Sequence, residues 1–353
     1  MIDRQALFSG TEAPPRHLEL DLARLAEWID GRVPGLGGRL SAEKFKGGQS
    51  NPTYLLRGET GRCILRRKPP GALVKSAHAI DREYRVMAAL AGAGVPVPQP
   101  FLYCDDPSVI GSEFYVAEFV EGRVFWDAEL PGVAPAERTA IYDGMNRALA
   151  ALHDLDPAAV NLGDLGAAEG YAARNFARWA GIYHGAALAD IPDMDWLIER
   201  LPGDMPEGET RLIHGDYGLY NLIVAADGPE LRAVLDWEMA TLGDPLIDLA
   251  HHLRAWWDLP DPAGAATSLA GHNLAALGIP DMAAYVQIYC AHRGIGVPDM
   301  RWYLAYAQFR YAAMIQGILK RAREGTAASR NMLHRQERVA EIAALSRRTL
   351  EGG

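Results

Sequence analysis

The stretch LIHGDYGLYNLIVAADGPELRAVLDWE, residues 212–238, contains Asp216, Asn221 five positions later and Asp236 fifteen positions after that. Short apolar runs rich in β-branched residues flank these three polar residues. Such runs, separated by an Asp-Gly-Pro turn at residues 227–229, predict two short strands joined in a hairpin. We expect this hairpin to hold the three polar side chains close together at one end.

The three residue types suit metal-assisted phosphoryl transfer from a nucleotide. This chemistry needs Mg²⁺ to bridge the phosphates, oxygen ligands for the metal, and a carboxylate that orients and deprotonates the attacking hydroxyl. We predict that Asp216 is the catalytic carboxylate and that Asn221 and Asp236 bind Mg²⁺, because the protein kinase signature has the same Asp-to-Asn spacing. The alternative, three ordinary turn residues at strand ends, requires order, spacing and strand context all to coincide.

Composition limits the classes of function. The chain has 353 residues, of which 49% are hydrophobic and 23% charged, as in globular proteins large enough for two lobes. A net charge of -10 argues against binding to nucleic acid or to an anionic membrane surface. Three cysteines without paired spacing disfavour a disulfide framework or a zinc site and favour a reducing cytoplasm. We expect a soluble protein, since neither a signal peptide nor a membrane span of ~20 apolar residues is evident.

Four phrases of the sequence resemble the aminoglycoside phosphotransferase and choline kinase family, which has the protein kinase-like fold. They are FKGGQSNPTYLL (45–56), DREYRVMAAL (81–90), IHGDYGLYNLIV (213–224) and LDWEMATLGDPLIDLA (235–250). Three further phrases are similar to the kinase-like domain linked to some acyl-CoA dehydrogenases and to its free-standing bacterial relatives. They are LRRKPPG (65–71), SAHAIDREYRV (76–86) and FRYAAMIQGILKRAREG (309–325). Together the resemblance covers roughly residues 40–330.

The resemblance implies an α+β, bilobal protein kinase-like fold. Residues 40–120, where short apolar runs alternate with turns around one helical segment, should form a small nucleotide-covering lobe of sheet plus helix. Residues 121–353 should form the larger, mainly helical lobe with the catalytic loop and the acceptor site. We expect residues 1–39 to be a helical extension, with a helix over 17–33.

The segment from Lys46 to Tyr54 contains Gly47, Gly48 and Ser50 ahead of a strand-like run. Glycines allow the backbone to come close to a phosphate, and the Ser50 and Asn51 side chains offer donors. A plain hairpin turn would explain this motif taken alone. In the company of the other kinase elements, we predict a loop that covers ATP.

The strand-like run after this loop carries a cation toward the phosphates. Aligned with the kinase pattern V-A-I-K, CILR places Arg66 where that pattern has lysine. Arginine can bind phosphate in a bidentate manner and pair with a carboxylate, although its planar fork differs from an ammonium group. Arg67 and Lys68 are substitutes for this role, and solvated charges at a strand end are the alternative.

The resemblance implies a carboxylate that fixes this cation and a connector that binds adenine. Glu83 is the expected partner of Arg66, and helical spacing places it on one inward stripe with Met87 and Leu90. The alternatives are Asp81 as the partner, or a Glu83 that is exposed to solvent. In this fold, backbone groups of the connector bind the adenine edge, so Glu118 and Val120 are the candidates by position. A buried strand without a ligand would have the same sequence pattern.

Several residues around the catalytic motif have expected supporting roles. By resemblance, His214 supports the catalytic loop. Asp244 suits a helix N-cap, and Asp248 a brace for that loop. Glu238 would share a face with Asp236 if the strand continues, where it could aid a second Mg²⁺ or the substrate, or be solvated. The adjacent histidines at 251 and 252 should point different ways on a helix, which disfavours a metal pair.

Recognition of the acceptor is expected in the C-terminal third. Helical segments there carry aromatic and cationic residues, although an aromatic stripe at helical spacing is more often core than site. Arginines suit an anionic acceptor such as a CoA ester, whereas polycationic aminoglycosides call for several carboxylates. The candidates for the acceptor or a second metal are Glu238, His292, Arg293, Tyr303 and Arg310.

The sequence therefore predicts an ATP- and Mg²⁺-dependent kinase that phosphorylates the hydroxyl of a small molecule. By resemblance, the acceptor is a hydroxyacyl-CoA, such as a 4-hydroxyacyl-CoA activated for later elimination, with a functional link to an acyl-CoA dehydrogenase. One alternative is an aminoglycoside, a choline-like alcohol or a sugar as the acceptor. Another is a nucleotide-binding pseudokinase or scaffold, which only the arginine at position 66 favours.

Overall fold

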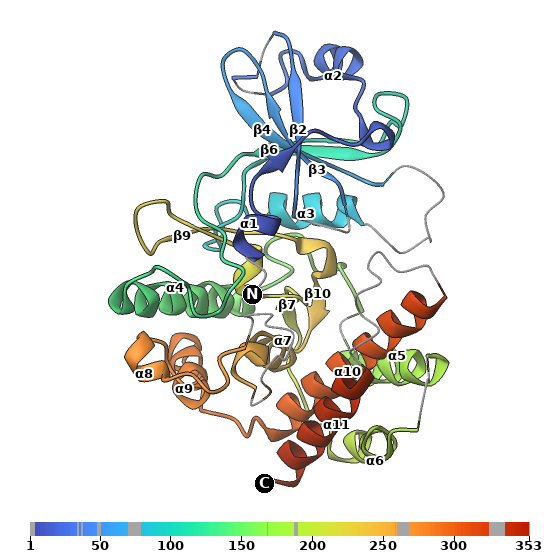
Figure 1. Cartoon of the computed structure of the whole chain (residues 1–353), viewed down its shortest axis with the longest axis vertical. Coiled ribbons are helices and arrows are strands. Elements are labelled where there is room, and N and C mark those ends of the chain that lie inside the picture. Colours follow the sequence, from blue (N-terminus) through green and yellow to red (C-terminus); the bar gives the residue numbers. More distant parts are fainter. Residues whose placement is uncertain are drawn as a thin grey trace.

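An antiparallel sheet forms one end of the molecule (Figure 1). The computed structural model describes residues 4–352, except 34, 37, 48–50, 70–78, 168, 187–189, 258, 260–267 and 325–335. The six strands lie in the order β1-β2-β3-β4-β6-β5. Their bounds are β1 Thr11–Glu12, β2 Ser41–Phe45, β3 Thr53–Arg57, β4 Arg62–Arg67, β5 Pro100–Cys104 and β6 Phe114–Glu118.

Side chains of β4 alternate between the two faces of the sheet, one of which packs on an apolar core. Cys63, Leu65 and Arg67 are buried, while the intervening residues are less so. This period of two places Cys63 and Leu65 in an apolar core under α2, and turns Arg66 to the opposite face of the sheet. The register sets Arg66 between Thr53 of β3 and Tyr115 of β6.

The helix predicted over 17–33 is wrong in extent. Only α2, Leu22–Ile29, is α-helical, and a 3-10 turn at Arg16–Leu18 precedes it. The side chain of Asp21 accepts a hydrogen bond from the Arg24 amide at 3.1 Å and so caps the helix start inside the predicted span. The N-terminal segment is also not purely helical, because β1 follows α1, Arg4–Phe8, and pairs with β2.

Helix α3, Ile80–Leu90, lies between the sheet and the helical part of the chain (Figure 1). The predicted inward stripe is confirmed, since Glu83, Met87 and Leu90 are all buried. Beyond the sheet the chain is mainly helical. The helices are α4 Pro135–Asp154, α5 Tyr171–Gly185, α6 Pro192–Arg200, α7 Pro245–His252, α8 Leu274–Leu277, α9 Met282–Arg293, α10 Arg301–Arg323 and α11 Gln336–Glu351.

Two small antiparallel pairs lie between the sheet and these helices. Strands β8, Leu222–Val224, and β9, Leu231–Val234, form the predicted hairpin around the turn at 227–229. The apolar residues Leu212 and Ile213 belong to β7, Arg211–Ile213, which pairs with β10, Thr241–Gly243. The catalytic motif thus runs from the end of β7 to just past β9.

The six-stranded sheet at one end and the mainly helical part at the other confirm the α+β, bilobal architecture expected from the sequence. Cys63, Cys104 and Cys290 are free and buried, as expected from their spacing. Among the helices of the described residues, none is both long and apolar enough to cross a membrane.

Candidate active site

The loop after β7 is held from below by Asp248 of α7. Asp248 Oδ2 accepts the His214 amide at 2.7 Å, and Oδ1 accepts the Gly215 amide at 2.9 Å. His153 Nε2 lies 3.2 Å from the same carboxylate, which is fully buried. Asp244 caps α7 by accepting the Leu246 amide at 2.8 Å. The geometry agrees with the predicted brace at Asp248 and N-cap at Asp244.

His214 ties the loop to the following strand pair. Its Nε2 lies 2.9 Å from the Leu235 carbonyl oxygen, and its Nδ1 accepts the Asp216 amide at 3.2 Å. Because both ring nitrogens are engaged and the side chain is fully buried, His214 supports the backbone on each side of Asp216. This geometry fits the supporting role expected for it and leaves no ring nitrogen for proton transfer.

The carboxylate of Asp216 is held mainly through one oxygen. Oδ1 accepts a hydrogen bond from the Tyr220 hydroxyl at 2.7 Å and lies 3.1 Å from His251 Nε2. Oδ2 has only a long contact of 3.4 Å with Asn221 Nδ2, and 35% of the side chain is exposed. One carboxylate oxygen is therefore available to a hydroxyl in the cleft.

The surroundings of Asp216 keep it ionised. Burial by itself would raise the pKa of Asp216, but His251, Arg254 and Tyr220 together lower it well below the usual range. Burial, reinforced by Arg310, lowers the pKa of His251 to about 4. His251 is therefore neutral at pH 7, and its Nε2–H donates to the carboxylate.

Asn221 lies beside Asp216, Asp236 lies beside Arg66, and both residue types suit Mg²⁺. Asn221 Nδ2 donates to the Asp216 carbonyl at 3.0 Å, which turns the amide oxygen the other way. The Asn221 carbonyl also accepts the Leu235 amide at 2.8 Å, so the residue preceding Asp236 is tied to Asn221. Asp236 lies two residues past the end of β9 and has φ +66°, an uncommon conformation for aspartate. The side-chain oxygen atoms of Asn221 and Asp236 are suitable ligands for a Mg²⁺ ion that a nucleotide brings with it.

Arg66 contacts Glu83 of α3, on its own side of the molecule, and two carboxylates from the segment after β9, Asp236 and Glu238. Its Nε lies 3.1 Å from Glu83 Oε2, while NH2 lies 2.5 Å from Asp236 Oδ1 and 3.8 Å from Glu238 Oε2. Only 11% of the Arg66 side chain is exposed. The predicted partner Glu83 therefore lies beside the predicted cation, which also contacts Asp236.

Burial and charge act in opposite directions within this cluster. Burial would lower the pKa of Arg66, but Glu83 and Asp236 raise it, so the guanidinium stays charged. Burial raises the pKa of Glu83 to about 7, even though Arg66 acts in the opposite direction. Tyr115 on β6 also donates a hydrogen bond to Glu83.

The substitutes considered for Arg66 point elsewhere. Arg67 Nε donates to Ser112 Oγ at 2.9 Å, and Lys68 Nζ pairs with Glu113 at 2.7 Å. Both side chains are thus engaged with the β5–β6 connection. Of the three candidate cations, Arg66, Arg67 and Lys68, Arg66 is the one beside Glu83 and Asp236.

The loop before β3 is described only in part. Gly48 and Ser50 lie outside the described residues. At Gly47 a Cβ atom would lie 3.1 Å from the Phe8 carbonyl and 3.3 Å from Trp126, so a side chain would crowd both. Asn51 is fully buried and donates to Glu238 Oε2 at 3.0 Å, which corrects its expected position as a phosphate donor.

Glu238 reaches this cluster by a route other than the one expected. No strand continues past Asp236, because Trp237–Met239 form a 3-10 turn. The turn nevertheless brings Glu238 to Asn51 and toward Arg66. The Glu238 carboxylate therefore lies on the nucleotide side of the cleft.

The connector after β6 contains Glu118 and Val120. The Glu118 amide donates to the Gln99 carbonyl at 2.8 Å, so an adenine contact from Glu118 would use its carbonyl. Val120 is half-buried just beyond the strand end. Further along, a Cβ at Gly122 would lie 2.2 Å from the Val224 carbonyl, so the connector passes tightly against β8.

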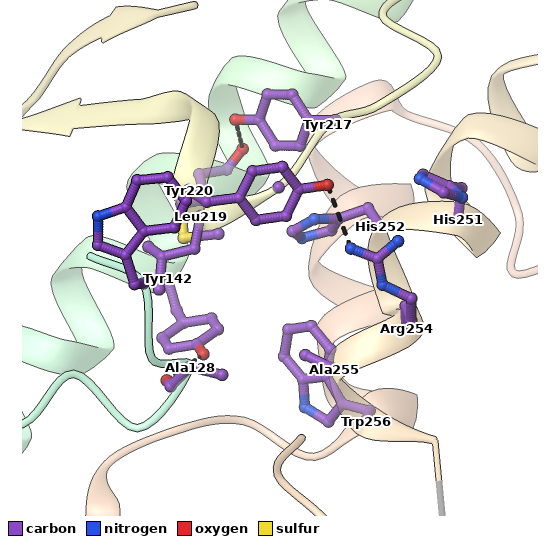
Figure 2. Close-up of a pocket in the computed structure, with 13 residues that line it drawn as sticks. Ala128, Tyr142, Tyr217, Leu219, Tyr220, His251, His252, Arg254, Ala255 and Trp256 are labelled. Carbon is purple, nitrogen blue, oxygen red and sulfur yellow. Dashed lines mark hydrogen bonds between the residues drawn. The ribbon is translucent and has the colours of Figure 1, made fainter. Parts of the chain in front are cut away.

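A pocket of about 40 Å³ opens next to the catalytic loop (Figure 2). Tyr220, His251 and Arg254 line one side, and Tyr142 and Trp256 line the other. No aspartate or glutamate is among the described residues of its wall. Tyr220 and His251 are the two residues that contact Asp216 Oδ1, so the pocket adjoins the catalytic carboxylate.

The acceptor residues expected in the C-terminal third lie outside this pocket. Arg293 pairs with Asp154 and Glu209, and the exposed His292 lies 3.4 Å from Asp143. Tyr303 is buried in the core, as aromatic residues at helical spacing commonly are. Arg310 NH2 donates to the Gly215 carbonyl at 3.0 Å and so supports the catalytic loop.

Three site residues were missed from the sequence: Tyr220, His251 and Arg254. Tyr220 lies inside the catalytic motif, one position before Asn221, so its place in the loop was a signal. His251 was treated only as half of a metal pair, and its neighbour His252 turns away to bond Tyr285 at 2.9 Å. No local pattern marks Arg254, because only the packing of α7 against the loop brings it to Tyr220.

Comparisons with known proteins agree with this geometry. The family model described as "Phosphotransferase enzyme family" matches residues 41–288. Acyl-CoA dehydrogenase family member 11 of Rattus norvegicus is 39% identical over 96% of this chain and 45% of its own length. Acyl-CoA dehydrogenase family member 10 of Mus musculus is 41% identical over 83% of this chain and 27% of its own. The chain thus spans less than half the length of these curated relatives.

Solved structures show the same fold. A Ralstonia eutropha JMP134 protein, provisionally described as an aminoglycoside phosphotransferase, is 43% identical with a TM-score of 0.86, over 95% of this chain and 99% of its own. A spectinomycin phosphotransferase, solved with ADP and spectinomycin, has a TM-score of 0.61 at 11% identity, over 94% of this chain and 99% of its own. The predicted protein kinase-like fold and phosphotransferase class are confirmed. The chain belongs to the phosphotransferase enzyme family.

Proposed function

We propose that the protein transfers the γ-phosphoryl group of ATP to the hydroxyl of a hydroxyacyl-CoA. The observation that carries the proposal is the continuous set of contacts from Glu83 through Arg66 to Asp236, with Asp216 next to a pocket that lacks acidic walls. Asp216 is the catalytic residue. Asn221 and Asp236 would hold Mg²⁺, which when bound would neutralise the phosphate oxygens.

The reaction forms one bond and breaks another. The acceptor oxygen bonds to the γ-phosphorus, the bond from that phosphorus to the bridging oxygen of ADP breaks, and ADP leaves with the electron pair. The hydroxyl proton passes to Asp216 as the transfer proceeds. Because the pKa of Asp216 is low, the carboxylate acts mainly by orienting the hydroxyl, so positioning and electrostatics supply most of the rate.

The nucleotide would lie under the segment that begins at Gly47. Gly47, Gly48 and Ser50 are assigned to its phosphates, together with Arg66 held by Glu83. The backbone at Glu118 and Val120 is assigned to the adenine edge. The crowding at Gly47 supports the need for glycine there, because a side chain would meet Phe8 and Trp126.

Two observations support an acyl acceptor. The relatives described above are named as acyl-CoA dehydrogenase family members, which supports a functional link between the two activities. The pocket beside Asp216 carries a cation and no carboxylate among its described residues, which suits an uncharged or anionic acceptor better than a polycation. A 4-hydroxyacyl-CoA, phosphorylated for later elimination, fits both.

We assign residues 40–120 to the nucleotide lobe, residues 121–353 to the acceptor lobe, and residues 1–39 to an extension. The end of β6 at Glu118 and the close approach of Gly122 to β8 support the boundary between the nucleotide lobe and the acceptor lobe. A cytoplasmic location is proposed because all three cysteines are free.

An acceptor panel tests the proposed function. Purified protein with ATP and Mg²⁺ should phosphorylate 4-hydroxypentanoyl-CoA, and phosphorus NMR should detect the phosphoester. Kanamycin, choline and glucose serve as the competing acceptors. Turnover of kanamycin without turnover of any hydroxyacyl compound would replace the proposed acceptor with an aminoglycoside, and absence of transfer to every acceptor would favour a nucleotide-binding scaffold.

A further inference from the structure

Arg254 is a cation in the wall of the pocket that no carboxylate neutralises directly within the described residues. Its NH2 donates to the Tyr220 hydroxyl at 3.1 Å. Its guanidinium otherwise contacts aromatic rings, lying 5.0 Å from the centre of Tyr311 and 5.8 Å from that of Tyr220. Among the described residues no aspartate or glutamate forms a direct ion pair with it, although the charge of Asp216, on the far side of the Tyr220 hydroxyl, raises the pKa of Arg254.

Burying a guanidinium group costs folding free energy unless the group has an anionic or hydrogen-bonding partner. Removing a guanidinium from water costs several kcal/mol, which a neutral hydroxyl and ring faces offset only in part. Arg293 is neutralised by both Asp154 and Glu209, whereas the buried Arg67 and Arg310 donate to uncharged oxygen atoms of the chain. The donors of Arg254 that Tyr220 does not use therefore suit an oxygen from outside the chain.

The position of Arg254 relates it to the reaction. The Tyr220 hydroxyl that accepts from Arg254 at 3.1 Å donates to Asp216 Oδ1 at 2.7 Å. The guanidinium nitrogen thus lies within about 6 Å of the catalytic carboxylate. Figure 2 shows Arg254 facing the Tyr220 hydroxyl, with Trp256 next to the same space.

We infer that Arg254 binds an acyl oxygen of the acceptor while Asp216 holds its hydroxyl, so that the pocket selects hydroxyacyl compounds. This inference rests on the proposed phosphoryl transfer and names the residue that sets its specificity. The acyl oxygen is a carboxylate in a free hydroxy acid and a carbonyl in a thioester, and a guanidinium can donate to either. A polycation would be repelled by Arg254 and would meet no carboxylate on the described wall.

Pairs of acceptors that differ only in the acyl oxygen test, with the unaltered enzyme, whether that oxygen is recognised. One pair is 4-hydroxypentanoyl-CoA and S-(4-hydroxypentyl)-CoA, in which a methylene replaces the carbonyl. The other is 4-hydroxypentanoate and pentan-2-ol. We expect kcat/KM to fall about 10- to 100-fold when the acyl oxygen is removed, because a donor built for it is left unpaired. A loss confined to the CoA pair identifies the thioester carbonyl, and a loss in the free-acid pair identifies the carboxylate.

Variants assign that selectivity to Arg254. Arg254→Gln should reduce kcat/KM for the acceptor that has the acyl oxygen, mainly by raising its KM. The values of kcat/KM for the two acceptors of a pair should then differ less than threefold. Arg254→Lys should restore part of the discrimination. Arg200→Gln, an exposed arginine on α6, is the matched control and should discriminate as the unaltered enzyme does. A purely structural role for Arg254 would lower both members of the pair equally.

The outcomes separate this inference from the proposed function. If hydroxyacyl compounds are phosphorylated but Arg254→Gln discriminates as well as the unaltered enzyme, the role of Arg254 is wrong and the function stands. If the enzyme phosphorylates only cationic acceptors, both are wrong. ATP affinity and thermal melting report whether Arg254→Gln folds. If it does not fold, equal turnover of both members by the unaltered enzyme overturns the inference.

Discussion

At the scale of single residues, Asp216 shows how one carboxylate can be both fixed and available. Two donors, Tyr220 and His251, hold Oδ1, while Oδ2 stays open to the cleft. Ordinary bases accept protons best when their pKa lies near the working pH. Here the low pKa instead favours a carboxylate that aligns a hydroxyl and accepts its proton late.

Tyr220→Phe should lower kcat about tenfold with little change in ATP affinity. The substitution removes the 2.7 Å hydrogen bond to Asp216 Oδ1, so the carboxylate is positioned less firmly. Tyr311→Phe is the matched control, because Tyr311 contacts Arg254 through its ring and keeps that ring. Steady-state kinetics checks both. Equal kcat in the two variants would show that the Tyr220 hydroxyl does not position Asp216.

Arg66→Lys should lower the activity of the enzyme, although the kinase pattern has lysine at this position. Arg66 uses Nε for Glu83 and NH2 for Asp236, and a single ammonium cannot reproduce that span. We expect kcat/KM for ATP to fall about tenfold or more. Arg62→Lys, at the exposed start of the same strand, controls for the chemical change. Activity at or above that of the unaltered enzyme would mean that Arg66 acts as a simple point charge.

At the scale of elements, helix α7 organises the catalytic loop. Asp248 accepts two loop amides, and His251, one turn later, reaches Asp216. His252 faces the other way, toward Tyr285. The spacing of Asp216 and Asn221 was enough to predict the chemistry, because both belong to one loop. The contribution of α7 depends on packing over more than thirty residues, so local patterns could not reveal His251.

The pH dependence of stability should carry a contribution from α7. Burial lowers the pKa of His252 to about 4 in the folded protein, against ~6.5 when unfolded. Between these values the unfolded chain binds more protons, so this residue destabilises the fold as pH falls from about 6.5 to 4. His252→Gln cannot titrate. From pH 7 to 4.5, the unaltered protein should lose about 2 kcal/mol more unfolding free energy than the variant.

Urea denaturation at several pH values measures this difference. The variant and the unaltered protein share every other titrating group, so the difference between them isolates His252. A difference that stays constant between pH 7 and 4.5 would show that His252 titrates alike in the folded and unfolded states.

At the scale of the whole molecule, the proposed nucleotide site lies where the sheet meets the helical part of the chain. Arg66 and Asn51 come from the sheet, and they contact Asp236 and Glu238 from the segment after β9. Arg82 of α3 adds a bond to the Ala240 carbonyl at 2.8 Å. Because one wall of the site comes from each lobe, nucleotide binding and lobe arrangement should be linked.

The sequence predicted the cluster of charges around Arg66 better than the pocket beside Asp216. Arg66, Glu83 and Asp236 each belong to a short motif with a recognisable neighbour pattern, and the structure brings them together. The pocket instead draws on Tyr142, Tyr220 and Arg254, which come from segments far apart in the chain. Aromatic helical stripes such as that of Tyr303 turned out to be core, since core packing and ligand binding favour the same side chains.

The most direct measurement of the central claim is the single-turnover rate of phosphoryl transfer from ATP to 4-hydroxypentanoyl-CoA by Asp216→Asn and by the unaltered enzyme. Asparagine keeps the size of the side chain but cannot accept the hydroxyl proton. We predict that the rate falls about 10³-fold while the ATP dissociation constant changes less than threefold. A rate within threefold of that of the unaltered enzyme would contradict the assignment of Asp216 as the catalytic carboxylate.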